Sequence, residues 1–80
     1  MLSLNIKYFG MTGEAAKKDN EVIKIEEPVS VDEIKNLILH KYPRLKKMDF
    51  QIALNLSIAA GSEMVNDNDE LALLPPFAGG

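Results

Sequence analysis

The five residues from Glu70 to Leu74 constrain the fold more than any other stretch of the sequence. Leu71 and Leu73 would lie on one face of a strand, because side chains alternate between its two faces. Ala72 and Leu74 would then lie on the other face, so that both faces are apolar. Such a strand is usually central in its sheet. The rest of the chain must therefore supply strands for both of its edges and a layer to cover at least one of its faces.

Three more stretches alternate between apolar and polar residues, as half-buried strands do: residues 2–9, 21–26 and 50–58. In the first, Phe9 adds an apolar side chain to the otherwise polar face. In the second, Ile23 and Ile25 should point inward. In the third, Asn55 lies on the polar face and can begin a tight turn, because asparagine tolerates left-handed backbone.

The clearest local signal is a helix that begins after Ser30. The Ser30 hydroxyl can accept a hydrogen bond from the Glu33 amide, and Asp32 adds negative charge at the positive end of the helix dipole. Pro43 disfavours helical backbone at Tyr42, so the helix should end there. Its apolar residues recur at helical spacing and would face the sheet: Val31, Ile34, Leu37, Ile38 and Tyr42.

The remaining segments predict connections. Residues 10–20 contain two glycines, several charges and little periodicity, which indicates a loop with at most a helical turn at residues 14–18. The elements then follow the order strand, strand, helix, strand, a short strand or turn, strand. One helix covering one face of a mostly antiparallel sheet is an α+β arrangement. We predict a single domain over residues 1–80, with residues 75–80 as an extended tail.

Composition argues against several classes of protein. The chain has 80 residues, of which 46% are hydrophobic and 26% charged, as in a small soluble domain. It has no cysteine, which rules out disulfides, thiolate metal sites and cysteine nucleophiles. A net charge of −3 disfavours nucleic-acid binding. The sequence shows no membrane-spanning run and no targeting segment, so we expect no membrane association and a cytoplasmic location. We also expect no metal site, because the acidic residues 67–70 lack the other ligands of a calcium loop.

Residues 74–80 read LPPFAGG and differ from an ordinary chain end. Pro75 should end the strand and Pro76 should keep the chain extended, because proline fixes φ and has no N–H to donate. Gly79 and Gly80 have no Cβ, so the backbone could enter a narrow slot and bring the terminal carboxylate to another protein's catalytic groups. The segment has no charged side chain, so its burial would desolvate only the backbone and the carboxylate. The pattern is typical of a tail that is inserted into a partner.

Apolar residues near the tail are candidates for contact with that partner. Phe77 lies beyond the last strand, and we expect it to anchor the tail. Phe9 and Leu74 would lie on the sheet face that the single helix leaves uncovered, where exposed apolar residues often mark an interface. Packing of both side chains against residues 10–20 is the alternative.

The order of elements resembles the β-grasp fold of ubiquitin-like proteins. The C-terminal third resembles the small, sulfur-carrying subunit of molybdopterin synthase, through Leu54-Asn55, residues 67–72 (DNDELA) and residues 74–80 (LPPFAGG). The proline pair followed by two variable residues and a terminal Gly-Gly is fairly specific to that branch. Related carriers of the thiamine pathway and of tRNA thiolation share the two glycines and typically lack the proline pair.

The resemblance implies a carrier that has no catalytic side chains of its own. A separate adenylating enzyme would use ATP to activate the Gly80 carboxylate, and a sulfur donor would convert the acyl-adenylate into a thiocarboxylate. The tail would then enter the large subunit of molybdopterin synthase and give its sulfur to a pterin precursor. Gly79 and Gly80 would form the reacting end, and the partner would contact Phe9, Leu74, Pro75, Pro76, Phe77 and Ala78. The assembly would be a hetero-oligomer, with no cofactor bound to this chain.

Two alternatives remain open at this point. The carrier could serve another acceptor, such as a thiamine precursor, tRNA, a tungsten pterin or protein lysines. The chain could instead be a ubiquitin-like binding module whose tail never reacts. A stand-alone enzyme is disfavoured, because the sequence offers no catalytic constellation.

Overall fold

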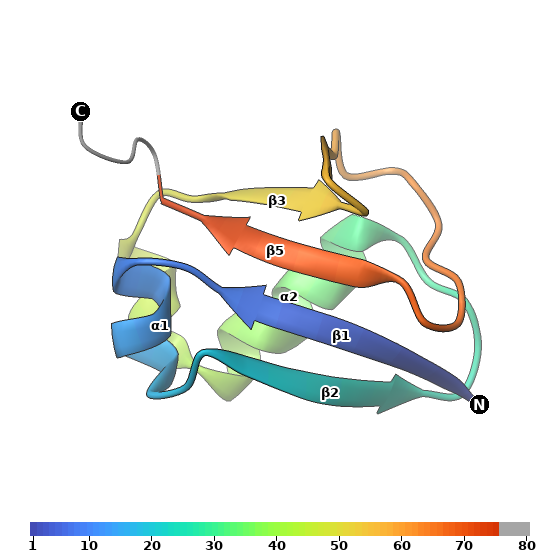
Figure 1. The fold of residues 1–80 in the computed structure, drawn as a ribbon, viewed down its shortest axis with the longest axis horizontal. Helices are drawn as coiled ribbons and strands as arrows, with labels where there is room; N and C mark the ends of the chain where they lie inside the picture. The colour runs from blue at the N-terminus through green and yellow to red at the C-terminus, as the bar shows by residue number, and fades with distance from the viewer. Residues whose placement is uncertain (76–80) are drawn as a thin grey trace.

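The computed structural model describes residues 1–75, and the predictions made for Pro76, Phe77, Ala78, Gly79 and Gly80 lie outside the described residues. The strands are β1 (Leu2–Tyr8), β2 (Asn20–Ile25), β3 (Gln51–Leu54), β4 (Ser57–Ile58) and β5 (Glu70–Leu74). The helices are α1 (Met11–Ala16), α2 (Val31–Lys41) and the 3₁₀ helix η1 (Pro43–Lys47). Figure 1 shows these elements along the chain.

The strands form one mixed sheet in the order β2-β1-β5-β3-β4. β5 is parallel to β1 and antiparallel to β3, while β1–β2 and β3–β4 are antiparallel pairs. The segment that is apolar on both faces is therefore the middle strand, as its sequence predicts, and the α+β arrangement is confirmed. Leu74, which precedes the predicted tail, is thus the last residue of the central strand.

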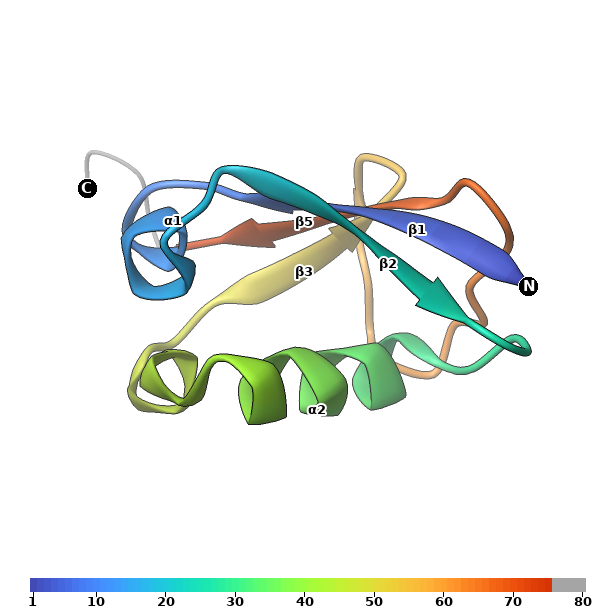
Figure 2. The ribbon, with the colours of Figure 1, turned by 90° about the horizontal axis from the view of Figure 1, so that it is seen from below.

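The sheet and α2 form two layers (Figure 2). On the sheet side the core contains Leu4, Ile6, Leu71 and Leu73, and on the helix side it contains Ile34 and Ile38, all with 0% of their surface exposed. Leu45 of η1, which follows the C-terminal end of α2, is also fully buried. This burial is the main source of stability in a domain of this size, because apolar area removed from water contributes roughly 25 cal/mol per Å².

The helix α2 begins as its sequence predicts. The Ser30 hydroxyl accepts a hydrogen bond from the Glu33 amide over 3.2 Å, and the last helical residue is Lys41, just before Tyr42. One residue of the predicted apolar stripe departs from it, because Leu37 is 40% exposed. The apolar stripe of α2 that packs on the sheet therefore contains fewer residues than the helical spacing in the sequence predicts.

The prediction of a loop over residues 10–20 was wrong, because this segment contains α1. The helix runs from Met11 to Ala16 and begins and ends earlier than the helical turn that was expected at residues 14–18. Thr12 and Ala16 are buried, so packing of this short helix on the domain compensates for its weak periodicity. The helix stops at Lys17, which is in the left-handed conformation with φ 62°.

The alternation over residues 50–58 does not belong to one continuous strand. β3 ends at Leu54, and Asn55 and Leu56 form a two-residue turn with φ 49° and 73°, as in a type I′ hairpin. β4 then pairs back on β3, with Ala53 opposite Ile58. Asn55 is therefore a turn residue as predicted, but counting every second residue misses the reversal of the chain.

Candidate functional site

The side of the sheet that faces away from α2, called the open face below, carries Phe9 and Leu74. The parallel register of Tyr8 with Leu73 places the next residue of each strand, Phe9 and Leu74, side by side on this face. The Phe9 N–H donates to the Leu73 carbonyl over 3.2 Å, which extends the pairing one residue beyond β1. Phe9 remains 46% exposed, so residues 10–20 leave much of it accessible. The structure brings these two predicted residues together beside the start of the tail.

Small residues form the floor of the open face. Ala72 lies between Ala53 and Lys7 on the neighbouring strands, and both alanines are buried, although neither belongs to the core beneath α2. Sequence reasoning missed Ala53 as a site residue. The available signal was an alanine between two larger apolar residues in each of two expected strands.

The rim of the open face contains both apolar and charged side chains. Ile58 on the edge strand β4 is 56% exposed, and Leu56 at the tip of the hairpin is 88% exposed. Between them and Phe9, Lys7 and Glu70 form an ion pair with 3.2 Å between Nζ and Oε1. An apolar floor with exposed apolar and charged residues at its margin has the composition of a protein-binding surface.

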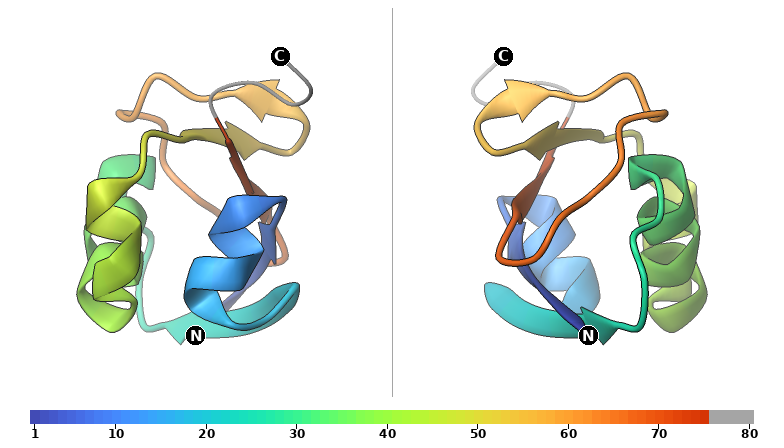
Figure 3. Two further views of the ribbon diagram at one scale, coloured as in Figure 1. Left: turned by 90° about the vertical axis from the view of Figure 1, so that its left-hand side faces the viewer. Right: turned by 90° about the vertical axis from the view of Figure 1, so that its right-hand side faces the viewer.

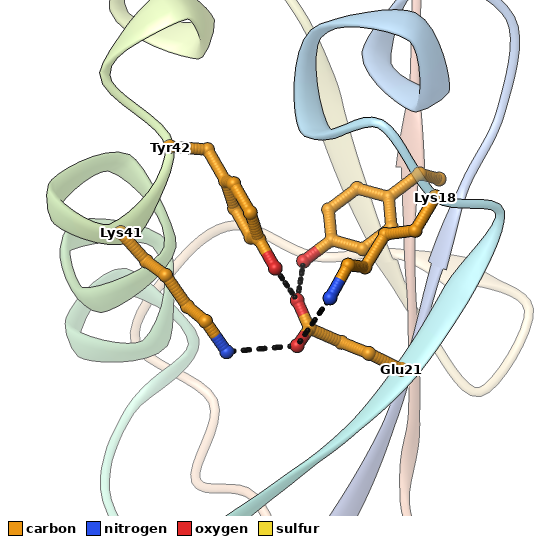
Figure 4. Close-up of polar contacts among 5 residues, drawn as sticks. Lys18, Glu21, Lys41 and Tyr42 are labelled. Atoms are coloured by element: carbon orange, nitrogen blue, oxygen red, sulfur yellow. Dashed lines mark hydrogen bonds and ion pairs between the residues drawn. The ribbon is translucent and has the colours of Figure 1, made fainter.

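A polar cluster around Glu21 lies on the opposite side of the sheet, between β2 and the C-terminal end of α2. The hydroxyls of Tyr8 and Tyr42 each donate to Glu21 Oε1 over 2.6 Å. Lys41 Nζ donates to Oε2 over 2.8 Å, and Lys18 Nζ lies 3.6 Å from the same oxygen (Figure 4). One carboxylate thus links β1, β2, the C-terminal end of α2 and the connection between α1 and β2.

The cluster fixes the charge of its members. Burial alone would raise the pKa of Glu21, but hydrogen bonds from Lys41, Tyr42 and Tyr8 outweigh it and lower this pKa from 4.5 to about 2. Burial and the hydrogen bond to Glu21 raise the pKa of Tyr8 above its usual value. Glu21 is therefore ionised and Tyr8 is neutral at physiological pH. The cluster holds no free acid, base or nucleophile, so it stabilises the fold and offers no catalytic group.

β5 ends at the side of the domain that also carries α1 (Figure 1; Figure 3, left). Pro75, which follows β5 and is the last described residue, is half-buried. A Cβ atom built on Gly10 would come within 3.2 Å of Pro75 Cγ, so the two residues are in close contact. Within residues 1–75, no three acidic or histidine side chains are grouped so that they could hold a metal ion. The helices of this part of the chain are also too short and too polar to cross a membrane.

Comparison with known proteins shows the family. A family model described as the ThiS family matches residues 6–80. The chain belongs to the ThiS family. A relative of this ThiS-family chain from Mycobacterium tuberculosis, named molybdopterin synthase sulfur carrier subunit, is 34% identical over the whole length of both chains.

Comparison with solved structures shows the fold. The fold is similar to that of molybdopterin converting factor subunit 1 from Pyrococcus furiosus, with a TM-score of 0.89, 23% identity and coverage of 96% of this chain and 100% of the other. It is also similar to a chain in the complex of subunits 1 and 2 of molybdopterin-converting factor from Helicobacter pylori, with a TM-score of 0.71, 28% identity and coverage of 99% and 100%. The ThiS-family chain therefore has the ubiquitin-like β-grasp fold that its order of elements resembles.

Proposed function

We propose that this chain is the sulfur carrier subunit of a molybdopterin synthase. The observation that carries the proposal is the course of β5, because the central strand leads at Leu74 directly into the residues LPPFAGG. The match to the ThiS family over residues 6–80 and the full-length similarity to a molybdopterin synthase sulfur carrier subunit support it. The described residues contribute a rigid base for the tail, and the reaction takes place at its end.

The proposed reaction proceeds in two steps at Gly80. The Gly80 carboxylate attacks the α-phosphate of ATP on an adenylating enzyme, which releases pyrophosphate and leaves an acyl-adenylate. Sulfide (HS⁻) delivered by a donor then attacks the carbonyl carbon, AMP leaves with the electrons of the C–O bond, and loss of the S–H proton leaves a thiocarboxylate. Adenylation is needed because a carboxylate is a poor acyl donor until it carries a good leaving group. Gly79 leaves room for the partner's groups to reach this carbon.

The open face is the surface that we assign to the large subunit. Phe9, Leu74 and the alanine floor form an apolar area at the base of the tail, so a partner that covers this area also receives the tail. The large subunit would also contact the residues that connect this area with the reacting end: Pro75, Pro76, Phe77 and Ala78. The Helicobacter pylori chain of similar fold belongs to a complex of two subunits, which supports a hetero-oligomer of the same kind.

An intact-mass measurement tests the proposed chemistry. The chain is purified from cells that contain its adenylating enzyme, and its C-terminal peptide is fragmented. We expect a mass gain equal to the replacement of one oxygen by sulfur, located at Gly80. A variant with one serine added after Gly80 is the control and should show no gain, because its terminal carboxylate no longer lies on Gly80.

The outcome also separates the alternatives. An unmodified carboxylate, even after incubation with ATP, the adenylating enzyme and a sulfur source, would contradict the carrier function and favour a binding module with an unreactive tail. Thiocarboxylate that does not lose its sulfur to a pterin precursor in the presence of the large subunit would favour a different acceptor, such as a thiamine precursor, tRNA or a protein lysine.

A further inference from the structure

Thr12 has a polar side chain that is fully buried, and it lies beside the start of the tail. Its hydroxyl donates to the Phe9 carbonyl over 2.6 Å and is 3.4 Å from the Leu73 carbonyl. A threonine in a first helical turn often bonds the carbonyl three residues back, which accounts for the contact with Phe9. It does not account for the position of the hydroxyl next to Leu73, two residues before Pro75.

The surroundings of Thr12 show that the hydroxyl is not required to satisfy the backbone. The Phe9 carbonyl already accepts from the Thr12 N–H over 3.1 Å, and the Leu73 carbonyl accepts from the Phe9 N–H over 3.2 Å. Burying a hydroxyl costs free energy unless it is hydrogen-bonded, and valine would fill nearly the same volume. The hydroxyl thus adds a link between the end of β1, the first turn of α1 and the last residues of β5.

Gly10 contacts the tail from the same side. Its backbone has φ 55° and ψ −132°, a combination that is open almost only to glycine. A Cβ atom at this position would meet the Pro75 ring, at 3.2 Å from Cγ and 3.9 Å from Cδ; apart from the chain neighbours of Gly10, no other residue of the described part of the chain lies within 4 Å of it. The missing side chain of Gly10 therefore makes room for Pro75.

Pro75 also lines a hollow, together with Met11, Lys47, Met48 and Asp49. A side chain added at Gly10 would push against the Pro75 ring, and neither Gly10 nor Pro75 belongs to the core beneath α2. A substitution at Gly10 can therefore change the direction of the chain at Pro75 while this core stays intact.

From these contacts we infer that Gly10 and Thr12 are positioning residues that set the direction in which the reactive tail leaves the domain. The inference rests on the proposed function, because a fixed direction matters when the tail must reach a reaction centre in a partner. Gly80 lies five positions after Pro75 in the sequence, and a chain of that length reaches at most about 17 Å when it is fully extended. A rotation of the chain at Pro75 would therefore move the Gly80 carboxylate away from the catalytic groups of the partner. Small misplacements of reacting groups reduce rates strongly.

The test is the kinetics of adenylation, followed by ATP–pyrophosphate exchange on the adenylating enzyme with this chain as the varied substrate. Thr12→Val should lower kcat about tenfold and leave the KM for the carrier nearly unchanged, because docking is intact and fewer docked tails are aligned. Thr12→Ser keeps the hydroxyl and should restore kcat. A purely structural role predicts the opposite split, since partial unfolding lowers the concentration of active carrier and so raises KM.

Gly10→Ala provides a second variant, and Gly61→Ala is its matched control. Gly61 also has positive φ, at 124°, and a Cβ there would meet the Asp32 carboxylate at the start of α2, far from the tail. Gly10→Ala should lower kcat, whereas Gly61→Ala should lower thermal stability with kcat unchanged. Wild-type kcat in Thr12→Val and Gly10→Ala, or an equal loss in both glycine variants, would overturn the inference while the carrier function stands. If the wild-type chain supports no exchange, the proposed function fails and this inference fails with it.

Discussion

The two faces of the sheet are built from the same strands and differ in what covers them. On the face beneath α2, Leu71 and Leu73 pack against Ile34 and Ile38 and are fully buried. On the open face, the intervening Ala72 forms a floor without large side chains, next to Leu74 and the half-exposed Phe9. β5 thus places Leu71 and Leu73 against α2, whereas it places Ala72 and Leu74 on the open face. The first face supplies stability, and we assign the second to a partner.

The largest effect should come from the covered face. Leu71→Ala removes a fully buried side chain and should lower the free energy of unfolding by about 2–5 kcal/mol. Leu56→Ala is the same chemical change at a position that is 88% exposed, and it should stay within about 0.5 kcal/mol of wild type. Urea denaturation followed by circular dichroism measures both. Equal losses in the two variants would contradict the division of the sheet into a stabilising and an accessible face.

The next largest effect should come from the Glu21 cluster, which closes the covered side at the end of α2. The pKa of Glu21 is about 2 in the folded chain and 4.5 in the unfolded one, so the stabilisation is complete above pH 4.5 and is lost as the pH falls toward 2. Glu21→Gln should lower the free energy of unfolding by about 1.5–3 kcal/mol at pH 7, because two tyrosines and Lys41 would then donate to an uncharged side chain. The measurement is the unfolding free energy between pH 2 and pH 7.

The pH dependence distinguishes this cluster from a general loss of stability. Glu21→Gln should have a flatter profile than wild type below pH 4.5, whereas Glu26→Gln, at an exposed position, should leave the free energy of unfolding at pH 7 nearly unchanged. Some slope should remain in both variants, because the amides of Ala60 and Gly61 bond the Glu63 carboxylate and lower its pKa as well. Identical profiles for Glu21→Gln and wild type would show that the cluster is not the source of acid sensitivity.

The third effect should appear in binding rather than in stability. Phe9→Asp on the open face should weaken binding to the large subunit at least about tenfold, a loss of about 1.4 kcal/mol, because it places a charge in an apolar interface. Leu37→Asp is the control, since Leu37 is similarly exposed, at 40% compared with 46%, but lies on α2 in the other layer. Titration calorimetry measures both affinities. A larger loss for Leu37→Asp would move the interface to the helical side of the molecule.

The covered face could be predicted from the sequence because its signals are local. Alternation identifies β1 and β2, the Ser30 cap fixes the start of α2, and the two apolar faces of residues 70–74 make β5 central. These patterns depend on spacing within one segment. Burial of every second residue then follows from the geometry of a strand.

The missed features depend on residues that are far apart in the sequence. α1 has little periodicity of its own and is held by the burial of Thr12 and Ala16 against the rest of the domain. Glu21 meets tyrosines 13 and 21 positions away. The sequence did contain a signal for the Glu21 cluster. Glu21 occupies an inward position of β2, in phase with Ile23, and a carboxylate that points inward requires hydrogen-bond or ionic partners.

The smallest effect should come from the hairpin tip at the rim of the open face. Leu56 has φ 73° and is 88% exposed, so its backbone is in a conformation that costs free energy for a leucine and its side chain gains almost no burial in return. Asn-Gly is the preferred pair for such a turn, and Leu56→Gly should therefore raise the free energy of unfolding by about 0.5–1 kcal/mol. A leucine that lowers stability at this position is explained if a partner buries it. Leu56→Gly should then bind the large subunit more weakly, whereas Leu56→Met should bind like wild type. Unchanged affinity in Leu56→Gly would limit the interface to the part of the open face around Phe9 and Leu74.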